Sequence, residues 1–167
     1  MMSIKNYKLV VVAFLLGNLI TACTSSKKST TTVDRGDLKG TWSLDNISYE
    51  GLPANQKLKL TLLDEGTDDC LRGSTWVLPN NGNGSYTIAQ SAPGCAAGQR
   101  NIVWSYRDEG GKNIFQFKKL TGGVKAKDIT EGYKFNIVTA TDNGFQLQSL
   151  VNFEGKGIAI NYYFIKK

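Results

Sequence analysis

Beyond residue 37, apolar and polar residues alternate with a period of two along most of the chain. Successive side chains of a β-strand point to opposite faces of a sheet, so this alternation predicts strands with one apolar and one polar face. Clusters of Gly, Asn and Asp separate the alternating segments, where other fold classes would carry helical patterns. The pattern therefore predicts an all-β domain with about nine strands.

The first of these segments places Trp42, Leu44 and Asn46 on one side of a strand. In the second segment, leucine alternates with lysine or threonine, which predicts one apolar and one solvated face. The expected strands are residues 40–49, 57–63, 74–79, 85–89, 101–106, 114–120, 132–141, 145–151 and 158–165.

Short turn sequences connect several of these segments, such as the glycine- and asparagine-containing residues 80–84 and 141–144. Strands joined by short turns pair with their neighbours in sequence, which builds an antiparallel meander. A long meander has two exposed edge strands unless it closes on itself. We therefore expect an up-and-down β-barrel of about 8–9 strands, with a β-sandwich as the alternative.

Residues 64–73, DEGTDDCLRG, interrupt the alternation. Aspartate favours the first position of a helix, so a short helical turn is expected to start at Asp68 or Asp69. The four carboxylates of this segment do not have the spacing of a calcium-binding loop. We interpret the segment as a solvated loop and expect no metal site.

The first residues of the chain predict a secretion signal. Lys5 and Lys8 precede an apolar run at residues 9–20, which is shorter than the roughly 20 residues of a membrane-spanning helix. The residues that follow, Leu-Ile-Thr-Ala-Cys at positions 19–23, resemble the lipobox of bacterial lipoproteins. That resemblance implies a signal peptide at 1–22 and lipidation of Cys23; the alternative is an ordinary cleaved signal.

Two or three acyl chains would provide a stable membrane anchor at Cys23. The polar residues after it predict a flexible tether at 23–36, followed by a single barrel domain at 37–167. Some surface-displayed lipoproteins carry an acidic tract directly after the lipidated Cys, and this chain has none there. We therefore expect an outer-membrane, lipid-anchored protein on the periplasmic face.

Charge and composition exclude several classes of function. The net charge is +6, and loss of Lys5 and Lys8 with the signal leaves +4, spread along the chain. This mild charge gives no support to nucleic-acid binding. The chain contains no His, which excludes Ser-His-Asp triads and His-ligated metal or haem sites. We expect a protein without catalytic activity or cofactor.

Two cysteines remain if Cys23 is acylated. In an oxidising compartment Cys70 and Cys95 are expected to form a disulfide, and two separate buried thiols are the alternative. A closed loop of this length stabilises the fold by roughly 3 kcal/mol in the chain-entropy model.

Three short motifs make the domain similar to a lipocalin. Gly40 to Trp42 match the Gly-x-Trp motif of the first lipocalin strand, and the Thr-Asp-Asn of residues 141–143 is similar to the second motif, Thr-Asp-Tyr. The third motif, a basic residue on the last strand, would be Lys166 or Lys167. The resemblance implies that Trp42 forms the barrel floor with this basic residue over it.

Barrels of about eight strands are either filled by side chains or hold one small ligand. Five aromatic residues are candidates for the lining of a ligand cavity, although aromatic residues at such positions are more often plain core: Trp76, Trp104, Phe117, Tyr133 and Phe135. The leading hypothesis is therefore a barrel that binds a small hydrophobic or amphipathic molecule. The alternative is a filled barrel that contacts another envelope protein through the loop around Cys70 and Cys95.

Overall fold

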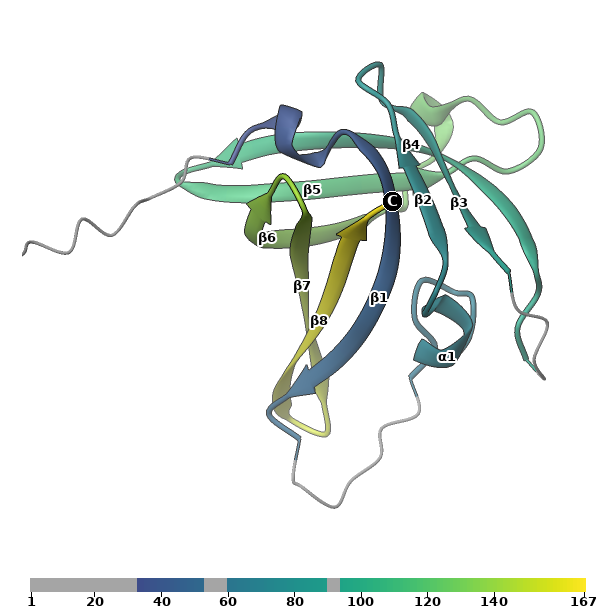
Figure 1. The fold of residues 1–167 in the computed structure, drawn as a ribbon. Helices are drawn as coiled ribbons and strands as arrows, with labels where there is room; N and C mark the ends of the chain where they lie inside the picture. Colours follow the sequence, from purple (N-terminus) through teal and green to yellow (C-terminus); the bar gives the residue numbers. More distant parts are fainter. Residues whose placement is uncertain (1–32, 53–59, 90–93) are drawn as a thin grey trace, which may run out of the picture. The chain divides into compact units, whose positions relative to one another are not determined.

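The computed structural model describes residues 33–52, 60–89 and 94–167 (Figure 1). The described residues belong to one compact unit, residues 32–167. The expected signal peptide, Cys23 and the tether up to residue 32 lie outside the described residues. In the described ranges, no helix is both long and apolar enough to cross a membrane.

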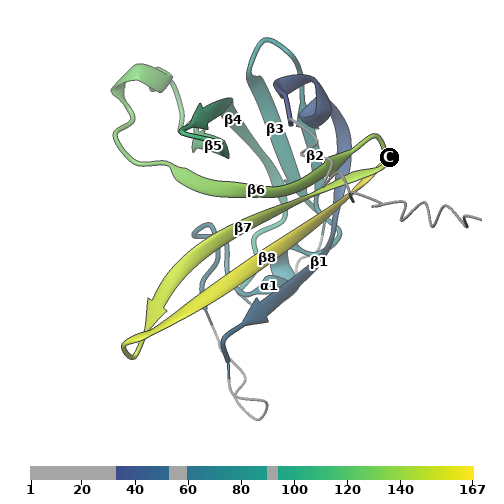
Figure 2. The same ribbon diagram turned by 90° about the vertical axis from the view of Figure 1, so that its left-hand side faces the viewer.

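The unit formed by residues 32–167 is a barrel of eight antiparallel strands. Each strand pairs with its neighbour in sequence, and β8 pairs with β1 to close the barrel (Figures 1 and 2). The all-β, up-and-down barrel is thereby confirmed, and a closed meander of eight strands is the lipocalin-like architecture. The strands are β1 (Gly40–Glu50), β2 (Thr75–Leu78), β3 (Asn83–Ile88), β4 (Gly98–Glu109), β5 (Lys112–Lys119), β6 (Tyr133–Thr141), β7 (Gly144–Phe153) and β8 (Lys156–Lys166).

In the described residues, three short helices accompany the strands. The 3-10 helix η1 (Arg35–Leu38) precedes β1, and the 3-10 helix η2 (Ala126–Asp128) lies between β5 and β6. The α-helix α1 (Asp68–Leu71) starts at Asp68, so the expected helical turn is confirmed. Ordered structure begins before residue 37, because Val33 is buried in the core and Asp34 caps η1.

The second expected strand, residues 57–63, is not among the eight strands. Residues 57–59 lie outside the described residues, and in residues 60–63 only Leu62 makes a bridge, an isolated one to Gly66. Leu62 and its neighbour Leu63 are both buried, whereas successive residues of a strand face opposite sides. For residues 60–63 the prediction of a strand was wrong, because the chain turns back on itself at residues 62–66 instead of extending.

The expected register of the first strand is correct only up to Leu44. A β-bulge lies between Leu44 and Asn46, where β1 contains one residue more than β8. The bulge turns Asn46 to the exposed side and buries Ile47 in the interior. The prediction that Asn46 shares a side with Trp42 was therefore wrong.

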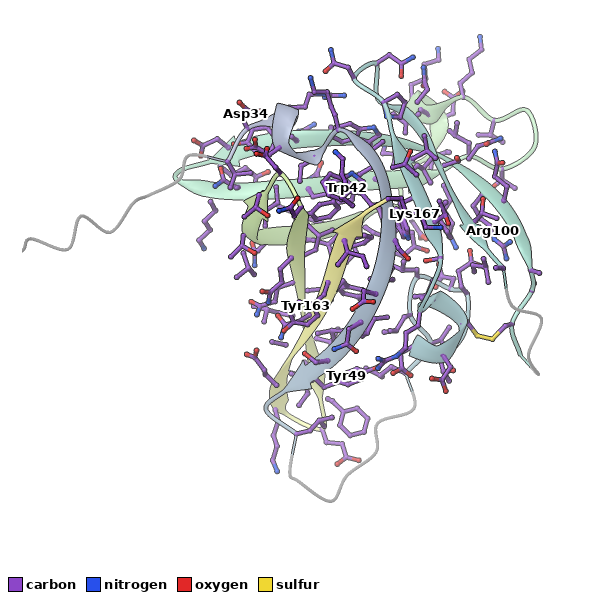
Figure 3. All side chains as sticks on the ribbon, viewed as in Figure 1. Asp34, Trp42, Tyr49, Arg100, Tyr163 and Lys167 are labelled. Carbon is purple, nitrogen blue, oxygen red and sulfur yellow. A yellow bond between two sulfur atoms is a disulfide. The ribbon has the colours of Figure 1, made fainter. Side chains whose placement is uncertain are left out.

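Trp42 lies beneath η1. We call η1, Trp42, Phe145 and Lys166 together the floor of the barrel. The buried indole donates a hydrogen bond from Nε1 to the carbonyl oxygen of Leu38, at 2.9 Å. Its ring meets Phe145 edge-on, with centroids 4.9 Å apart. The ammonium group of Lys166 lies 4.1 Å from the centre of the indole ring. Figure 3 labels Trp42 and shows it beside η1.

Candidate functional site: a cavity between β6 and β7

The wall of the barrel is split between β6 and β7. The two strands pair from Thr141 and Gly144 as far as Asn136 and Gln148. Beyond that point residues 133–135 of β6 pair only with β5, and residues 149–153 of β7 pair only with β8. The strands therefore diverge, and Figure 2 shows β6 leaving the direction that β7 and β8 share.

A cavity of about 290 Å³ lies in this split, and we call it the β6–β7 cavity. Its volume is near the lower end of the range of roughly 300–1,000 Å³ that is typical of small-molecule sites. The lining is mostly apolar, with a few hydroxyl groups among the aliphatic and aromatic side chains. It consists of Leu60, Thr61, Leu62, Leu63, Gly132, Tyr133, Lys134, Phe135, Ser149, Val151, Ile160 and Tyr162.

One side of the cavity is a tight turn at residues 62–66. The amide of Leu62 donates to the carbonyl oxygen of Gly66 at 2.7 Å, and the amide of Glu65 donates to the carbonyl oxygen of Leu62 at 2.9 Å. Leu63 and Asp64, at the tip, have φ angles of 52° and 55°. Left-handed backbone is uncommon for residues other than glycine, and costs about 1–3 kcal/mol per residue. The turn places Leu62 and Leu63 against the cavity.

The same turn directs Glu65 into the interior of the barrel. The side chain of Glu65 is only 7% exposed. Arg100 donates to its Oε2 from Nε at 3.0 Å and from Nη2 at 2.7 Å. Tyr86 donates to Oε1 at 2.6 Å, and Lys119 donates to Oε1 at 3.1 Å. We call Glu65 with these three partners the Glu65 cluster.

The interpretation of residues 64–73 as a solvated loop was therefore wrong for Glu65. Burial alone would raise the pKa of this carboxyl group, because it penalises the charged form. The hydrogen bonds from Arg100, Tyr86 and Lys119 outweigh burial and hold the pKa below its ordinary value of 4.5. Glu65 is thus a buried, ionised carboxylate near neutral pH.

Tyr133 connects the Glu65 cluster to the cavity. Its ring lines the cavity, and its hydroxyl group donates a hydrogen bond to the carboxylate of Asp64. The ammonium group of Lys119 lies 5.4 Å from the centre of the same ring and donates to the carbonyl oxygen of Leu63 at 2.6 Å. Burial and the hydrogen bond to Asp64 raise the pKa of Tyr133. The apolar cavity and the charged cluster are therefore direct neighbours.

Of the five aromatic residues predicted to line a cavity, the structure places Tyr133 and Phe135 in the lining. Trp76 and Phe117 lie in the packed interior, where their rings meet edge-on at 5.4 Å. Trp104 is also buried, with Phe115 stacked at 5.9 Å. The guanidinium group of Arg35, from η1, lies 4.3 Å from the ring of Trp104. These three residues do not line the β6–β7 cavity.

Other lining residues carried weaker signals in the sequence. Ile160 and Tyr162 lie on the buried side of β8, as the alternation of that strand indicates. The alternation of leucine with polar residues indicated an apolar face for Leu60 and Leu62, but Leu63 and Glu65 had no such signal, because their positions depend on the left-handed turn. The inward side of β8 was predictable, but its place beside a split in the wall was not.

The predicted disulfide between Cys70 and Cys95 is confirmed, with Cα atoms 5.4 Å apart. It joins α1 to the segment that leads into β4, and Figure 3 shows it on the same side of the barrel as Arg100. Cys70 is buried. The bond fixes the chain directly after the 62–66 turn, which forms one side of the cavity.

The described part of the chain contains no group of three or more His, Cys, Asp or Glu side chains arranged to hold a metal ion. No protein-family model matches the chain, and no curated protein matches it. Among solved structures, a lipocalin-like protein from Bacteroides uniformis ATCC 8492 is similar, with a TM-score of 0.45 and 12% sequence identity. The similarity covers 79% of this chain and 100% of that protein. The description of the fold as a lipocalin-like barrel rests on the strand pairing of the chain itself.

Proposed function

We propose that the protein is a lipid-anchored lipoprotein of the cell envelope whose barrel binds a small hydrophobic or amphipathic molecule without catalysis. The observation that carries the binding function is the apolar cavity of about 290 Å³ where β6 separates from β7. A barrel that served only as a packed scaffold would gain stability by continuing the ladder between these strands. The resemblance of residues 19–23 to a lipobox supports the anchor, and the lack of an acidic tract directly after Cys23 supports the periplasmic face of the outer membrane.

Native mass spectrometry tests the binding function. A soluble form of residues 33–167 contains all eight strands and both cysteines of the disulfide. After expression in the envelope, or incubation with an envelope lipid extract, it should carry a discrete adduct that is lost on denaturation. A bare mass under both conditions would overturn the binding function.

Two matched variants locate the ligand. Val151→Trp places a large side chain in the cavity lining and should abolish the adduct. Leu150→Trp makes the same change at the adjacent residue, which is 68% exposed on the outside of β7, and should leave the adduct unchanged. Equal loss in both variants, or in neither, would show that the molecule binds elsewhere.

The anchor has a separate test. Mass spectrometry of the N-terminal peptide from membranes should find acyl chains on Cys23, and Cys23→Ser should remove both the acyl chains and the membrane association. An unmodified Cys23 would replace the anchor with an ordinary cleaved signal and would leave the binding function intact.

The packing of the interior also supports the second candidate, a filled barrel that contacts another envelope protein. Trp76 stacks on Tyr86 with centroids 4.5 Å apart, and both side chains are buried. Such packing leaves the β6–β7 cavity as a small remainder of the interior. A bare mass in the experiment above would favour this candidate, with the disulfide-bonded loop as the contact surface.

A further inference from the structure

We propose that Arg100, Lys119 and Tyr86 form a binding site for the anionic head of an amphipathic ligand, and that Glu65 occupies this site until the ligand replaces it. The ligand class is then a carboxylate with an aliphatic tail, whose tail lies in the β6–β7 cavity. This inference rests on the proposed binding function and deepens it by naming the chemistry of the ligand.

The three donor side chains project from the inner face of the barrel wall. Arg100 on β4 lies opposite Tyr86 on β3, and Tyr86 is fully buried. Lys119 on β5 lies opposite Ile102, which is also fully buried. Residues directly opposite each other in an antiparallel pair share a face of the sheet. The donors therefore belong to three adjacent, hydrogen-bonded strands.

Backbone carbonyl groups hold Arg100 in place without help from Glu65. Its Nη1 donates to the carbonyl oxygen of Gly98 at 2.8 Å, and its Nη2 donates to that of Ala96 at 2.6 Å. A guanidinium group held in this way presents its remaining donors in a fixed orientation, and such a fork suits a carboxylate. The site is preorganised for an anion.

The acceptor, in contrast, comes from an irregular segment. Glu65 follows Leu63 and Asp64, which both have left-handed backbone, and this conformation is unfavourable for a leucine. Strained backbone that persists is characteristic of ligand clamps and of segments that move. Glu65 therefore has the features of a replaceable occupant in a site built by the barrel wall.

The charges of the cluster favour such an exchange. Two cations and one hydroxyl group contact the single carboxylate of Glu65. The second carboxylate in range, Asp64, is 4.0 Å from Lys119 and 80% exposed. Exchange of Glu65 for a ligand carboxylate conserves the charge of the site and returns Glu65 to water, so no buried cation loses its partner.

The cavity is located where the tail of such a ligand would lie. Tyr133 lines the cavity and contacts Lys119, and Leu63 lines the cavity and accepts a hydrogen bond from Lys119. A carboxylate at Lys119 can thus extend its chain into the apolar lining. Glu65 competes for the same donors. The apparent affinity of the wild type therefore equals its intrinsic affinity multiplied by the fraction of time that the site is free.

Binding of decanoate and 1-decanol to the soluble form of residues 33–167 tests the proposal. Both ligands have the same tail, and only decanoate has the anionic head. Isothermal titration should show that Glu65→Ala binds decanoate at least about tenfold more tightly than the wild type does, because the competing carboxylate is gone. Binding of 1-decanol should change by less than about twofold, since the cavity is unaltered.

Two control variants separate the head from the tail. Arg100→Met in the Glu65→Ala background should remove the preference for decanoate over 1-decanol. Lys112→Met, which removes an exposed cation of β5 that does not line the cavity, should keep the preference. Circular dichroism establishes first that each variant is folded.

A measurement on the wild type keeps the test decisive if Glu65→Ala does not fold. Carboxyl ¹³C NMR should show the pKa of Glu65 rising to its ordinary value when decanoate saturates the protein, because Glu65 has lost its donors. An unchanged Glu65 signal in the saturated complex would overturn the proposal. In a folded Glu65→Ala variant, equal affinity for decanoate and 1-decanol would also overturn the proposal while leaving the proposed function intact, and binding of neither ligand would contradict both.

Discussion

Trp42 connects parts of the barrel floor that are distant in sequence. Its indole nitrogen is bonded to η1, its edge packs on Phe145 at the start of β7, and its face lies under Lys166 at the end of β8. A fully buried aromatic ring stabilises the fold through the apolar area that it buries, and its hydrogen-bonded N–H group fixes the orientation of the ring. Trp42 therefore fixes η1 to the strands that close the barrel.

Trp42→Ala should lower the free energy of unfolding by about 3–5 kcal/mol, because it leaves a large cavity and an unpaired carbonyl group. Urea unfolding monitored by circular dichroism gives the value. Val77→Ala is the control: Val77 is 40% exposed, and its loss should change stability by less than about 0.5 kcal/mol. A similar small effect for Trp42→Ala would show that the floor is not a stability centre.

The positions of individual residues in the fold differed in how well the sequence could predict them. Trp104 and Phe117 were correctly placed on the inner faces of strands, because regular pairing preserves the alternation. Glu65 was not predictable in the same way. Its partners Arg100 and Lys119 are 35 and 54 residues away, and only the closed barrel brings them together. A local pattern of acidic residues contains no information about partners so distant.

The prediction of individual elements depended on the residues in the turns as well as on the alternation within the strands. The turn between β6 and β7 was expected from Gly144 and its polar neighbours, and the structure places it there. The 62–66 turn has Leu63 and Asp64 at its tip, where a type I′ turn usually carries Asn and Gly. The sequence therefore indicated a continuing strand, and the bulge in β1 likewise had no local signal.

The turn between β7 and β8 offers a prediction about element stability. Glu154 and Gly155 form its tip, with φ angles of 51° and 80°. Glu154→Asn should stabilise the protein by about 0.5–1 kcal/mol, since Asn tolerates left-handed backbone better than Glu. Thermal unfolding measures the shift.

Gly155→Ala is the matched change in the opposite direction. A Cβ atom at Gly155 would contact nothing within 4 Å, so its effect reports backbone conformation alone. It should destabilise the protein by about 1–2 kcal/mol. If both variants were neutral, the backbone of this turn would differ from that described.

The disulfide should stabilise the barrel by roughly 3 kcal/mol, as the closure of a loop by residues 25 apart implies. Thermal unfolding with and without dithiothreitol should show a large decrease in Tm under reducing conditions. The double variant Cys70→Ser/Cys95→Ser should unfold at the lower Tm in both buffers. A wild-type Tm that is insensitive to the reductant, with reduction verified by mass spectrometry, would contradict this role.

At the scale of the whole molecule, tyrosines that are buried or half-buried make the fold sensitive to alkali. Burial raises the pKa of Tyr49 to about 12 from its ordinary value of 10.0, and burial also raises the pKa of Tyr86, Tyr106, Tyr133 and Tyr162. The folded state keeps these protons at a pH where the unfolded state releases them. Stability from this source is therefore complete below pH 10 and decreases as the pH rises toward 12 and beyond.

Two measurements check this alkaline sensitivity. Absorbance of tyrosinate at 295 nm should rise well above pH 10 in the folded protein and near pH 10 in urea. The free energy of unfolding should decrease continuously across the same interval. Tyr49→Phe removes one of these hydroxyl groups and should make the decrease shallower. A folded protein that titrates like the unfolded chain would contradict the burial of these side chains.

The global architecture was more predictable than the site, because closure follows from a property shared by all strands. Repeated alternation with short turns specifies a meander, and a meander without free edges must close. The cavity results from an exception to that regularity, the early end of the ladder between β6 and β7 at Asn136 and Gln148. Exceptions of this kind arise from the packing of the whole barrel.

The pairing of β1 with β8 also has a consequence for the order of folding. Trp42 pairs with Lys166, and Glu50 pairs with Ala159, so the first strand needs β8 as its partner. A chain emerging from a ribosome therefore cannot complete the barrel until β8 has emerged. Contacts of such long sequence separation slow folding, and the edges of β1 and β7 remain available for aggregation until β8 arrives.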